Sequence, residues 1–499
     1  MVTKEVSAKQ PWATLAYASL LLLFGAVYVY AHHRAAFALP TPWSDEGRFV
    51  WPAISFQRSL SLLAPQLNPY RPIYWMPPGY MVALGIIFRI FGFSLGLARS
   101  VSMIFMIGTF IVTALMLRKY SLSFLSLLLL GLFFLNGPFV AAGNVARMEA
   151  LLLLAVSVGV LLVQRGMPYR GLALLALTPL IHPNGLFFFL SAATYVILTN
   201  HLRKGSCPKS RTRADTLLIA VALMLWIAYA VHIGQDLPSF LNDMSYQFAR
   251  KGQIDILQGF VSTEGLTFLS LSLLCLAYGT AKRVPATFLL VFAIPAWLVF
   301  KVGREMWYQV FHGLSYALLS ITLLHVGHHL LDHVGTSRVT CTRWLLPPAL
   351  AVGLLFWNVS NGRAISGIRY PTNLKWAGMR IPGEVSYLNS TDIRTVRLFL
   401  STLPSQGRPA RVQFMPAADA LFFHDMDGRE ILIWEPLFLN ERADVYVIHI
   451  TRYAPSWYSE SLKASLRGMG LDPSDESHIV LQRDGSEIWY FSFRQTVQH

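Results

Sequence analysis

The sequence predicts an α-helical polytopic membrane protein with a small α/β domain at its C-terminus. Hydrophobic residues make up 54% of the 499 residues and charged residues 13%, half of the ~25% that is usual in soluble globular chains. Mean hydropathy is +0.47.

Lys and Arg number 41 against 26 Asp and Glu, a net charge of +15. From Ser360 onward there are 15 basic and 15 acidic residues, so the whole excess lies in the apolar part. This composition excludes a disordered chain, a disulfide scaffold and an ordinary soluble enzyme, and it indicates membrane loops rather than nucleic-acid binding.

The first apolar run extends from Trp12 to Tyr30. Its length is close to the ~20 residues that a bilayer-spanning helix needs. The alternative is a secretory signal peptide with Ala36-Phe37-Ala38 as its cleavage site. Because the run is longer than the ~7–15 apolar residues of a signal peptide, we expect an uncleaved anchor helix.

Later apolar runs predict further spans, although several are shorter than a full span. They lie at Leu97–Leu117, Leu122–Val140, Ala150–Val163, Gly171–Ile181, Leu186–Leu198, Thr216–Ile233, Leu266–Gly279, Pro285–Phe300, Trp307–Leu324 and Trp344–Trp357. One more apolar segment, Pro77–Phe93, opens with two prolines and carries Arg89. It could span the bilayer or lie in the interface as an amphipathic helix. If it lies in the interface, the chain has about eleven spans, and the side of the N-terminus collects 15 basic and 3 acidic residues. The positive-inside rule makes that side cytoplasmic, so we place this segment in the interface.

The predicted topology puts the N-terminus inside and the C-terminus outside. Residues 1–359 form the transmembrane domain and residues 360–499 a separate extracytoplasmic domain. Residues 32–96 become one long first external loop, and loops of this length are usually functional. The three cysteines of the chain all precede residue 360, so no disulfide framework is predicted in the outer domain.

The C-terminal domain is predicted as a small α/β fold. Alternating apolar residues and turn signals indicate two helices and five strands. The helices are expected at Asp392–Leu403 and Ser456–Arg467, and the strands at Arg411–Phe414, Glu430–Trp434, Asp444–Ile450, Ile479–Gln482 and Glu487–Phe493. The last two strands flank an Asp-Gly pair, which predicts a hairpin.

Ser44-Asp45-Glu46 lies just outside the first span. Two adjacent carboxylates at a membrane surface can provide a general base or bind a divalent cation. The alternative is a helix N-terminus, with Ser44 as the cap and both acids in the first turn. The two interpretations are compatible with each other.

Two more polar motifs stand at the predicted outer ends of spans. Arg147-Met148-Glu149 opens the run at Ala150, where an ionised carboxylate is costly; the alternative is an Arg147–Glu149 pair at a helix start. His182-Pro183-Asn184-Gly185 separates two spans. His182 there can donate to a phosphate or position a substrate, and the alternative is a polar turn that breaks the helix.

A cationic cluster of Lys301 and Arg304, with Glu305, is followed by Trp307 and Tyr308. Cations at the outer interface suit an anionic lipid headgroup, because Arg can hold a phosphate with two hydrogen bonds. The alternative is anchoring by interfacial aromatic residues and snorkelling charges. This alternative fits Lys301 better than Arg304.

Four of these features share one order and one side of the membrane. They are the acidic pair, Trp75-Met76-Pro77-Pro78-Gly79-Tyr80, Ala146-Arg147-Met148-Glu149-Ala150 and His182-Pro183-Asn184-Gly185. In this order they resemble the GT-C membrane glycosyltransferases of the protein O-mannosyltransferase and aminoarabinose-transferase type. The resemblance covers roughly Trp12 to Trp357, and the C-terminal domain resembles the variable outer domain that many of these proteins carry. It implies a donor of polyprenyl phosphate bearing one sugar, used on the outer face.

The resemblance also implies roles for single residues. Asp45 takes the role of the catalytic base and Glu46 supports it, while Glu149 matches an acidic residue that opens a later span. The Pro-Pro motif of the family often carries a Lys or His that contacts the donor phosphate, and this chain has Met76 and Tyr80 there instead. Binding of the phosphate is therefore expected from Arg304, His182 and Arg147, and binding of the substrate from Arg48, Trp75 and Tyr80.

The resemblance therefore implies a glycosyltransferase, expected to be inverting and to lie in the bacterial inner membrane, with a lipid, glycan or protein acceptor. It assigns no cofactor, and a divalent cation beside Asp45 and Glu46 is left open. The alternative from another class is a transporter or flippase of a lipid-linked or anionic substrate, because polar residues inside spans also mark transport paths. One outer cavity that contains Asp45, Glu149 and His182 would favour the enzyme.

Overall fold

A computed structural model gives the fold of the chain. It describes residues 11–38, 44–74, 76–120, 122–135, 137–202, 212–251, 260–303, 308–334, 375–376, 379–380, 390–403, 408–415, 417–428, 431–435, 442–450, 460, 463–464, 466–468, 479–481 and 487–492. The predicted run at Trp344–Trp357 and the candidate residues Trp75 and Arg304 lie outside the described residues.

The chain folds into two compact units. The first comprises Met1–Ala31, Met103–Gly143 and Met148–Ile368, and the second comprises His32–Ser102, Asn144–Arg147 and Arg369–His499. The predicted division into residues 1–359 and 360–499 follows the chain, whereas these units combine segments that are distant in the sequence.

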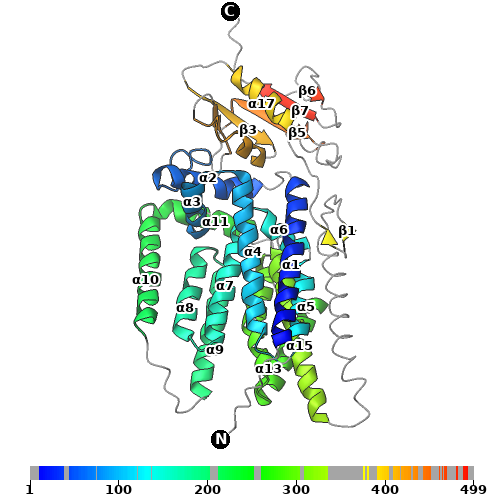
Figure 1. Cartoon of the computed structure of the whole chain (residues 1–499). Helices are drawn as coiled ribbons and strands as arrows, with labels where there is room; N and C mark the ends of the chain where they lie inside the picture. Colours follow the sequence, from blue (N-terminus) through cyan, green and yellow to red (C-terminus); the bar gives the residue numbers. More distant parts are fainter. Residues whose placement is uncertain are drawn as a thin grey trace, which may run out of the picture. The chain divides into compact units, whose positions relative to one another are not determined.

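The first unit is a bundle of helices that run side by side (Figure 1). Its elements are most of α1 (Pro11–Ala38), the greater part of α4 (Leu95–Leu117), α5 (Ser123–Phe134), α6 (Gly137–Asn144), α7 (Met148–Gln164), α8 (Pro168–Leu177), η1 (Thr178–Leu180), α9 (Gly185–Leu202), α10 (Arg213–Gly234), α11 (Leu237–Lys251), α13 (Thr263–Ala281), η2 (Pro285–Leu289), α14 (Leu290–Gly303) and α15 (Gln309–Val334).

Long apolar helices confirm the predicted polytopic membrane protein. Among the described residues, five helical segments are long and apolar enough to cross a bilayer, or up to six if α5 and α6 form one broken span. The five are Leu95–Leu117, Arg213–Gly234, Thr263–Ala281, Pro285–Gly303 and Gln309–His333. The total of about eleven spans and the inside position of the N-terminus remain predictions.

Short connections fix which helix ends lie together in the first unit. α7, α8 and α9 follow each other with brief turns, and so do α13, α14 and α15. The start of α7, the end of α8 and the start of α9 therefore share one end of the helices. The start of α13, the end of α14 and the start of α15 likewise share one end. A hydrogen bond between His182 and Tyr308 joins the two groups, so all six helix ends lie at the same end of the bundle.

Glycines let α7 and α8 approach closely. A Cβ on Gly171 would lie 2.7 Å from the carbonyl oxygen of Gly159, and a Cβ on Gly159 would lie 2.6 Å from Leu175 Cγ. Small residues at such contacts allow close backbone packing of membrane helices. Beyond this contact, η1 and α9 also pack on α7, so the α8–α9 turn with His182 lies beside the same helix.

The second unit begins with two helices of the first external loop. α2 (Ser44–Ser59) begins at Ser44, so both acids lie in its first turn, and α3 (Gly79–Phe91) follows the Pro-Pro motif. α3 has 13 residues, well short of the ~20 that a span needs. This length fits the predicted interfacial position. α2 and α3 pack together, and Gly85 of α3 lies directly against Phe56 of α2.

The C-terminal part of this unit is the predicted α/β domain. Its described elements are β1 (Lys375–Trp376), β2 (Met379–Arg380), α17 (Ser390–Ser401), β3 (Ala410–Met415), η5 (Ala417–Phe423), β4 (Ile431–Ile433), β5 (Val445–Ile450), β6 (Ile479–Leu481) and β7 (Glu487–Ser492). A five-stranded sheet has the order β4-β3-β5-β7-β6. β3 pairs in parallel with β4 and β5, whereas β7 pairs antiparallel with β5 and β6. The predicted hairpin is the β6–β7 pair.

The sheet has an aromatic core on one face. Trp434, Tyr446, Trp489 and Phe491 are buried there together with Ile448. Large aromatic side chains contribute most of the buried apolar area in such a small core. The sheet therefore gives a rigid support to the segment that leaves β4 at residues 434–435.

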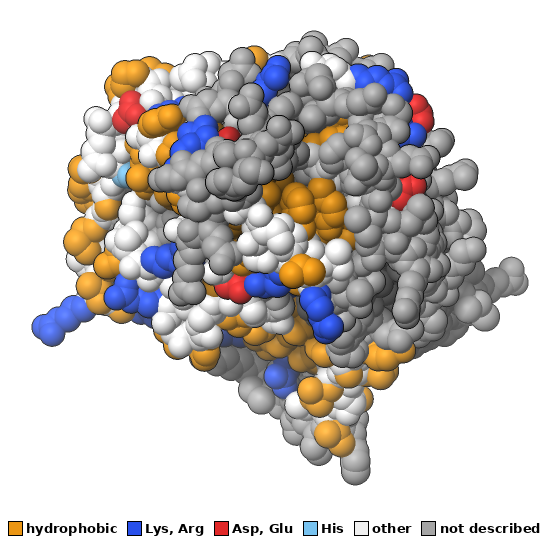
Figure 2. Space-filling view, turned by 90° about the horizontal axis from the view of Figure 1, so that it is seen from above, with side chains coloured by type: hydrophobic (Ala, Val, Ile, Leu, Met, Phe, Trp, Pro, Cys, Tyr) orange, Lys and Arg blue, Asp and Glu red, His pale blue; other side chains and the backbone are white. Residues whose placement is uncertain are grey.

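The surface shows no single basic area in the view of Figure 2. Over the part of that face that the structure describes, Lys and Arg side chains lie in separate places with hydrophobic side chains between them. Nucleic-acid-binding proteins gather Lys and Arg on one face or stripe.

Candidate functional site

Glu46 is completely buried at the start of α2. Arg99 of α4 grips its carboxylate with two hydrogen bonds, from Nε to Oε1 at 3.0 Å and from Nη2 to Oε2 at 2.7 Å. The backbone N–H of Ala146 donates to Oε1 at 2.8 Å. Charge-assisted bonds of this fork geometry are among the strongest in proteins. Glu46 therefore links the acidic pair directly to the motif that begins at Ala146, 100 residues further along the chain.

Phe49 gathers two more of the predicted residues. The guanidinium of Arg147 lies over its ring, 5.5 Å from the centroid, and the ring of Tyr80 meets it edge-on at 5.8 Å. Both side chains are buried, Arg147 with 4% exposed and Tyr80 with none. The Tyr80 hydroxyl lies 3.4 Å from Ser102 Oγ. Within the second unit, Glu46, Arg147 and Tyr80 thus form one cluster.

The remaining first-loop residues have different surroundings. Arg48 points to the C-terminal domain, where its Nε lies 3.8 Å from Glu435 Oε1. Asp45 occupies the first turn of α2 by its backbone, and its side chain lies outside the described part of the chain. Trp75 and Arg304 also lie outside it. The predicted roles of these four residues remain proposals.

Glu149 and His182 belong to the first unit and lie at the same end of its helices. Glu149 is in the first turn of α7 and is 3% exposed. His182 is 2% exposed. Its Nδ1 accepts a hydrogen bond from the Asn184 N–H at 3.0 Å, and its Nε2 lies 3.2 Å from the Tyr308 hydroxyl. Because Nδ1 accepts, the hydrogen of the neutral ring is on Nε2 and is donated to Tyr308.

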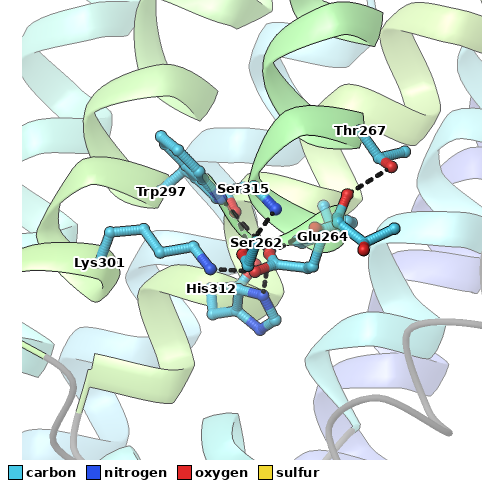
Figure 3. A network of polar contacts seen from close by, with 10 residues as sticks. Ser262, Glu264, Thr267, Trp297, Lys301, His312 and Ser315 are labelled. Atoms are coloured by element: carbon cyan, nitrogen blue, oxygen red, sulfur yellow. Dashed lines mark hydrogen bonds and ion pairs between the residues drawn. The ribbon is translucent and has the colours of Figure 1, made fainter. Parts of the chain in front are cut away.

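A buried ionic network occupies the same end of the bundle, where α13, α14 and α15 meet (Figure 3). Its centre is the carboxylate of Glu264 in the first turn of α13. Lys301 forms an ion pair with Oε2. His312 Nε2 lies 3.1 Å from Oε1, and the Tyr316 hydroxyl donates to the same oxygen at 2.6 Å. Trp297 adds a longer contact from its indole N–H at 3.4 Å.

This network changes the interpretation of Lys301. The sequence suggested that Lys301 binds phosphate or snorkels to the interface, but the residue is 6% exposed and paired with Glu264. Its ammonium also lies 5.5 Å from the ring centroid of Trp297. Lys301 is therefore a structural cation that joins α13 and α14.

The sequence analysis missed Glu264, although a signal was present. Glu264 is an acidic residue at the start of an apolar span, and ionisable residues within spans are functional candidates by default. Its partners lie 37, 48 and 52 residues later in the chain. No short motif could connect them.

The described side chains do not form a metal centre. Among them, no group of three or more His, Cys, Asp and Glu residues lies close enough to hold a metal ion. The cation that the sequence leaves open would involve Asp45, whose side chain lies outside the described part of the chain.

Comparison with known proteins gives one type of neighbour. No protein-family model and no curated protein match the chain. Among solved structures, its neighbours are two crystal structures of ArnT, a GT-C aminoarabinose transferase, from Cupriavidus metallidurans. One is bound to undecaprenyl phosphate, and this match covers 97% of this chain and 98% of that chain, with 13% identity and a TM-score of 0.48. The other is in the apo state, with the same identity and TM-score, and its match covers 95% of this chain and 98% of that chain.

Proposed function

We propose that the chain is a membrane glycosyltransferase that moves one sugar from a polyprenyl-phosphate donor to an acceptor on the outer face. The acceptor is a lipid, a glycan or a protein. The observation that carries the proposal is the set of hydrogen bonds on Glu46. These bonds bring the first-loop acidic motif to the Ala146–Glu149 motif, as a shared site of the two would require.

The proposed reaction follows from the charges of these residues. An acceptor hydroxyl or amine attacks the anomeric carbon, and the bond between that carbon and the phosphate oxygen breaks. Asp45 takes the proton of the acceptor, a step for which a general base typically supplies about 10²–10⁴-fold. The lipid phosphate leaves with its electron pair, and the anomeric centre is inverted.

Cations and hydrogen-bond donors would stabilise the leaving phosphate. Arg304, Arg147 and His182 are assigned to it, and such preorganised electrostatic stabilisation is often the largest single term in catalysis. Arg48, Trp75 and Tyr80 are assigned to the rest of the substrate. His182 donates its Nε2–H to the Tyr308 hydroxyl, so in this proposal it acts on the phosphate through Tyr308 or exchanges this hydrogen bond when the donor binds.

A polyprenyl donor also suits the secondary structure of the first loop. Its hydrocarbon chain lies in the bilayer, while its headgroup reaches the interface. α3, a 13-residue apolar helix with Arg89 in its last turn, has the composition of a helix at this boundary. We place the enzyme in the bacterial inner membrane, with the N-terminus in the cytoplasm and the C-terminal domain outside.

The experiment is sugar transfer by the purified full-length protein from a panel of labelled polyprenyl-phosphate sugars. Membrane extract serves as the source of acceptors, and parallel reactions contain EDTA. Wild type is compared with Asp45→Asn and with Asp332→Asn. Asp332 is an exposed carboxylate near the opposite end of α15, paired with His328, so it is the matched control.

Loss of at least about 10²-fold in turnover for Asp45→Asn, with Asp332→Asn unchanged, is the expected result. Equal activity of Asp45→Asn and wild type would remove Asp45 as the base. A product with retained configuration would exclude single displacement. If no donor is used by wild type, the glycosyltransferase proposal fails, and the transporter alternative is tested next by uptake into proteoliposomes.

A further inference from the structure

The C-terminal domain meets the first external loop within the second unit. The backbone N–H of Glu435 donates to the carbonyl of Gln66 at 2.9 Å, and the side chain of Gln66 donates to Asp427 Oδ2 at 2.6 Å. The rings of Phe93 and His424 lie edge to face, 4.7 Å apart. η5 also packs on α2. The first loop is thus held by residues from the far end of the chain.

One of these residues reaches the first turn of α2. Glu435 is 7% exposed, and a Cβ added to Gly47 would overlap its Oε2. The same Cβ would lie 3.3 Å from Trp51 Nε1. The Glu435 carboxylate therefore fills the space directly over Gly47, and Arg48 partly balances its charge from 3.8 Å.

We infer that Glu435 is a positioning residue of the transfer site, which makes the C-terminal domain a working part of the enzyme. This inference rests on the proposed function. Gly47 lies two residues after Asp45 in the first turn of α2. Glu435 presses on this turn from the C-terminal domain, and the Arg99–Glu46 pair holds it through α4. Both contacts thereby restrain the turn that carries Asp45.

The buried carboxylate of Glu435 at this contact favours a positioning role over simple attachment of the domain. A domain that is only attached to the loop could use apolar side chains, because replacing buried ionic groups with apolar ones is often neutral or stabilising. The Glu435 carboxylate, packed directly on Gly47, instead fixes the distance and the orientation of the C-terminal domain relative to the first turn of α2. Displacement of a catalytic group by about 1 Å can cost about 10²-fold in rate, so this contact is expected to control kcat.

The test uses full-length protein in nanodiscs. The variant is Glu435→Gln, which keeps the shape of the side chain and removes its charge. The matched control is Arg408→Gln in the same domain. Arg408 forms two hydrogen bonds to Asp444, at 2.8 and 2.9 Å, with its side chain 55% exposed. Two readouts are compared: kcat and KM for the donor that wild type uses, and hydrogen exchange of the peptides that cover α2 and β5.

For Glu435→Gln we expect kcat to fall about 10- to 100-fold, with KM unchanged, together with faster exchange in α2 and unchanged exchange in β5. Gly47→Ala should lower kcat similarly, because its methyl group displaces the carboxylate. Adding Glu435→Asp to Gly47→Ala shortens the acid by one methylene and should restore part of the lost kcat. Arg408→Gln should match wild type.

Three results would overturn the positioning role: no change in either readout for Glu435→Gln, an equal loss of kcat in Arg408→Gln, or faster exchange in β5 as well as α2. The last would mean that Glu435 only stabilises its own domain. If wild type transfers no sugar, the proposed function fails. The exchange comparison then still shows whether Glu435 fixes the first turn of α2.

Discussion

Asp45 and Glu46 are adjacent at the start of α2, but we assign them different roles, because the carboxylate of Glu46 is held by hydrogen bonds within the protein. The carboxylate of Glu46 accepts three hydrogen bonds, from the two arms of Arg99 and from the Ala146 N–H. These three hydrogen bonds occupy both carboxylate oxygens with protein donors, which leaves Glu46 poorly placed to contact a substrate. Its neighbour Asp45 is therefore the better candidate for the base, and Glu46 supports it by fixing the helix start.

Replacing Glu46 tests this division of tasks. Glu46→Gln should lower the free energy of unfolding by about 3–5 kcal/mol, because it breaks a buried ion pair by neutralising the partner that Arg99 grips with two hydrogen bonds. Thermal unfolding in detergent, followed by tryptophan fluorescence, measures the change. Arg170→Gln is the control, since its pair with Asp215 is partly exposed and should contribute about 1 kcal/mol or less. Equal shifts in the two variants would contradict a structural role for Glu46.

Asp427 and Asp425 are close in sequence, but their environments shift their pKa values in opposite directions. Burial raises the pKa of the Asp427 carboxyl, against the effect of the N–H of Ile433 and the amide of Gln66. Arg397 lowers the pKa of the Asp425 carboxyl by pairing with it. A raised acid pKa gives stability below the unfolded pKa, about 3.9, that is lost as the pH rises through the folded value. A lowered acid pKa gives stability above 3.9 that is lost as the pH falls through the folded value.

Asp427→Asn should therefore gain stability relative to wild type as the pH rises from about 4 to 7. The oxygen of the Gln66 amide is buried without a hydrogen-bond partner, so turning this amide lets Gln66 accept from the new Asn. Asp425→Asn should lose stability relative to wild type as the pH rises from the lowered folded pKa to about 4, with a small constant loss above that because the pair is exposed. Melting temperatures from about pH 2 to 7 give both slopes. A falling slope for Asp427→Asn would show that burial does not dominate its pKa.

Local periodicity predicted the elements, but not the way in which they meet. The strands at Arg411–Phe414 and Asp444–Ile450 were predicted within one residue of β3 and β5, because β3 alternates and β5 is a short apolar run with β-branched residues, and both patterns are visible in the sequence. The order of the sheet depends on crossovers that periodicity does not encode. The ion pair of Glu46 with Arg99 spans 53 residues, and that of Glu264 with Lys301 spans 37. Such pairs are fixed by helix packing, so the acidic pair was recognised without its partners.

At the scale of helices, Glu264 holds the ends of α13, α14 and α15 together. Lys301→Met should destabilise the bundle, because it leaves the Glu264 carboxylate inside it without its cation, and Glu264→Gln should do the same to Lys301. The double variant removes both charges and should be more stable than either single variant. Thermal unfolding measures all three. Thr267→Ala is the control, because this hydroxyl only bonds back to Thr263 in its own helix. Additive losses in the double variant would contradict an ion pair that couples the helices.

At the scale of the whole molecule, three segments that are separated in the sequence by predicted spans form one compact unit. Residues 32–102, 144–147 and 369–499 form one compact unit, and a bilayer cannot pass between parts of a packed unit. We therefore expect these segments to lie on one side of the membrane, with an even number of spans between each segment and the next. α4 with the α5–α6 pair provides such an even number between the first loop and Ala146, if each crosses once. The first loop and the C-terminal domain consequently share a side.

Which side that is can be measured by cysteine labelling, and the proposed chemistry requires the outer side. In a variant with Cys207, Cys275 and Cys341 replaced by serine, Ser401→Cys places a thiol on an exposed position of α17, and Arg118→Cys places one at the opposite end of α4. A membrane-impermeant maleimide added to intact spheroplasts should label residue 401 at once and residue 118 only after permeabilisation. The basic excess lies in the loops on the side of residue 118, and such loops stay in the cytoplasm. The reverse pattern would put Asp45 and the C-terminal domain in the cytoplasm, where a donor used on the outer face could not reach them.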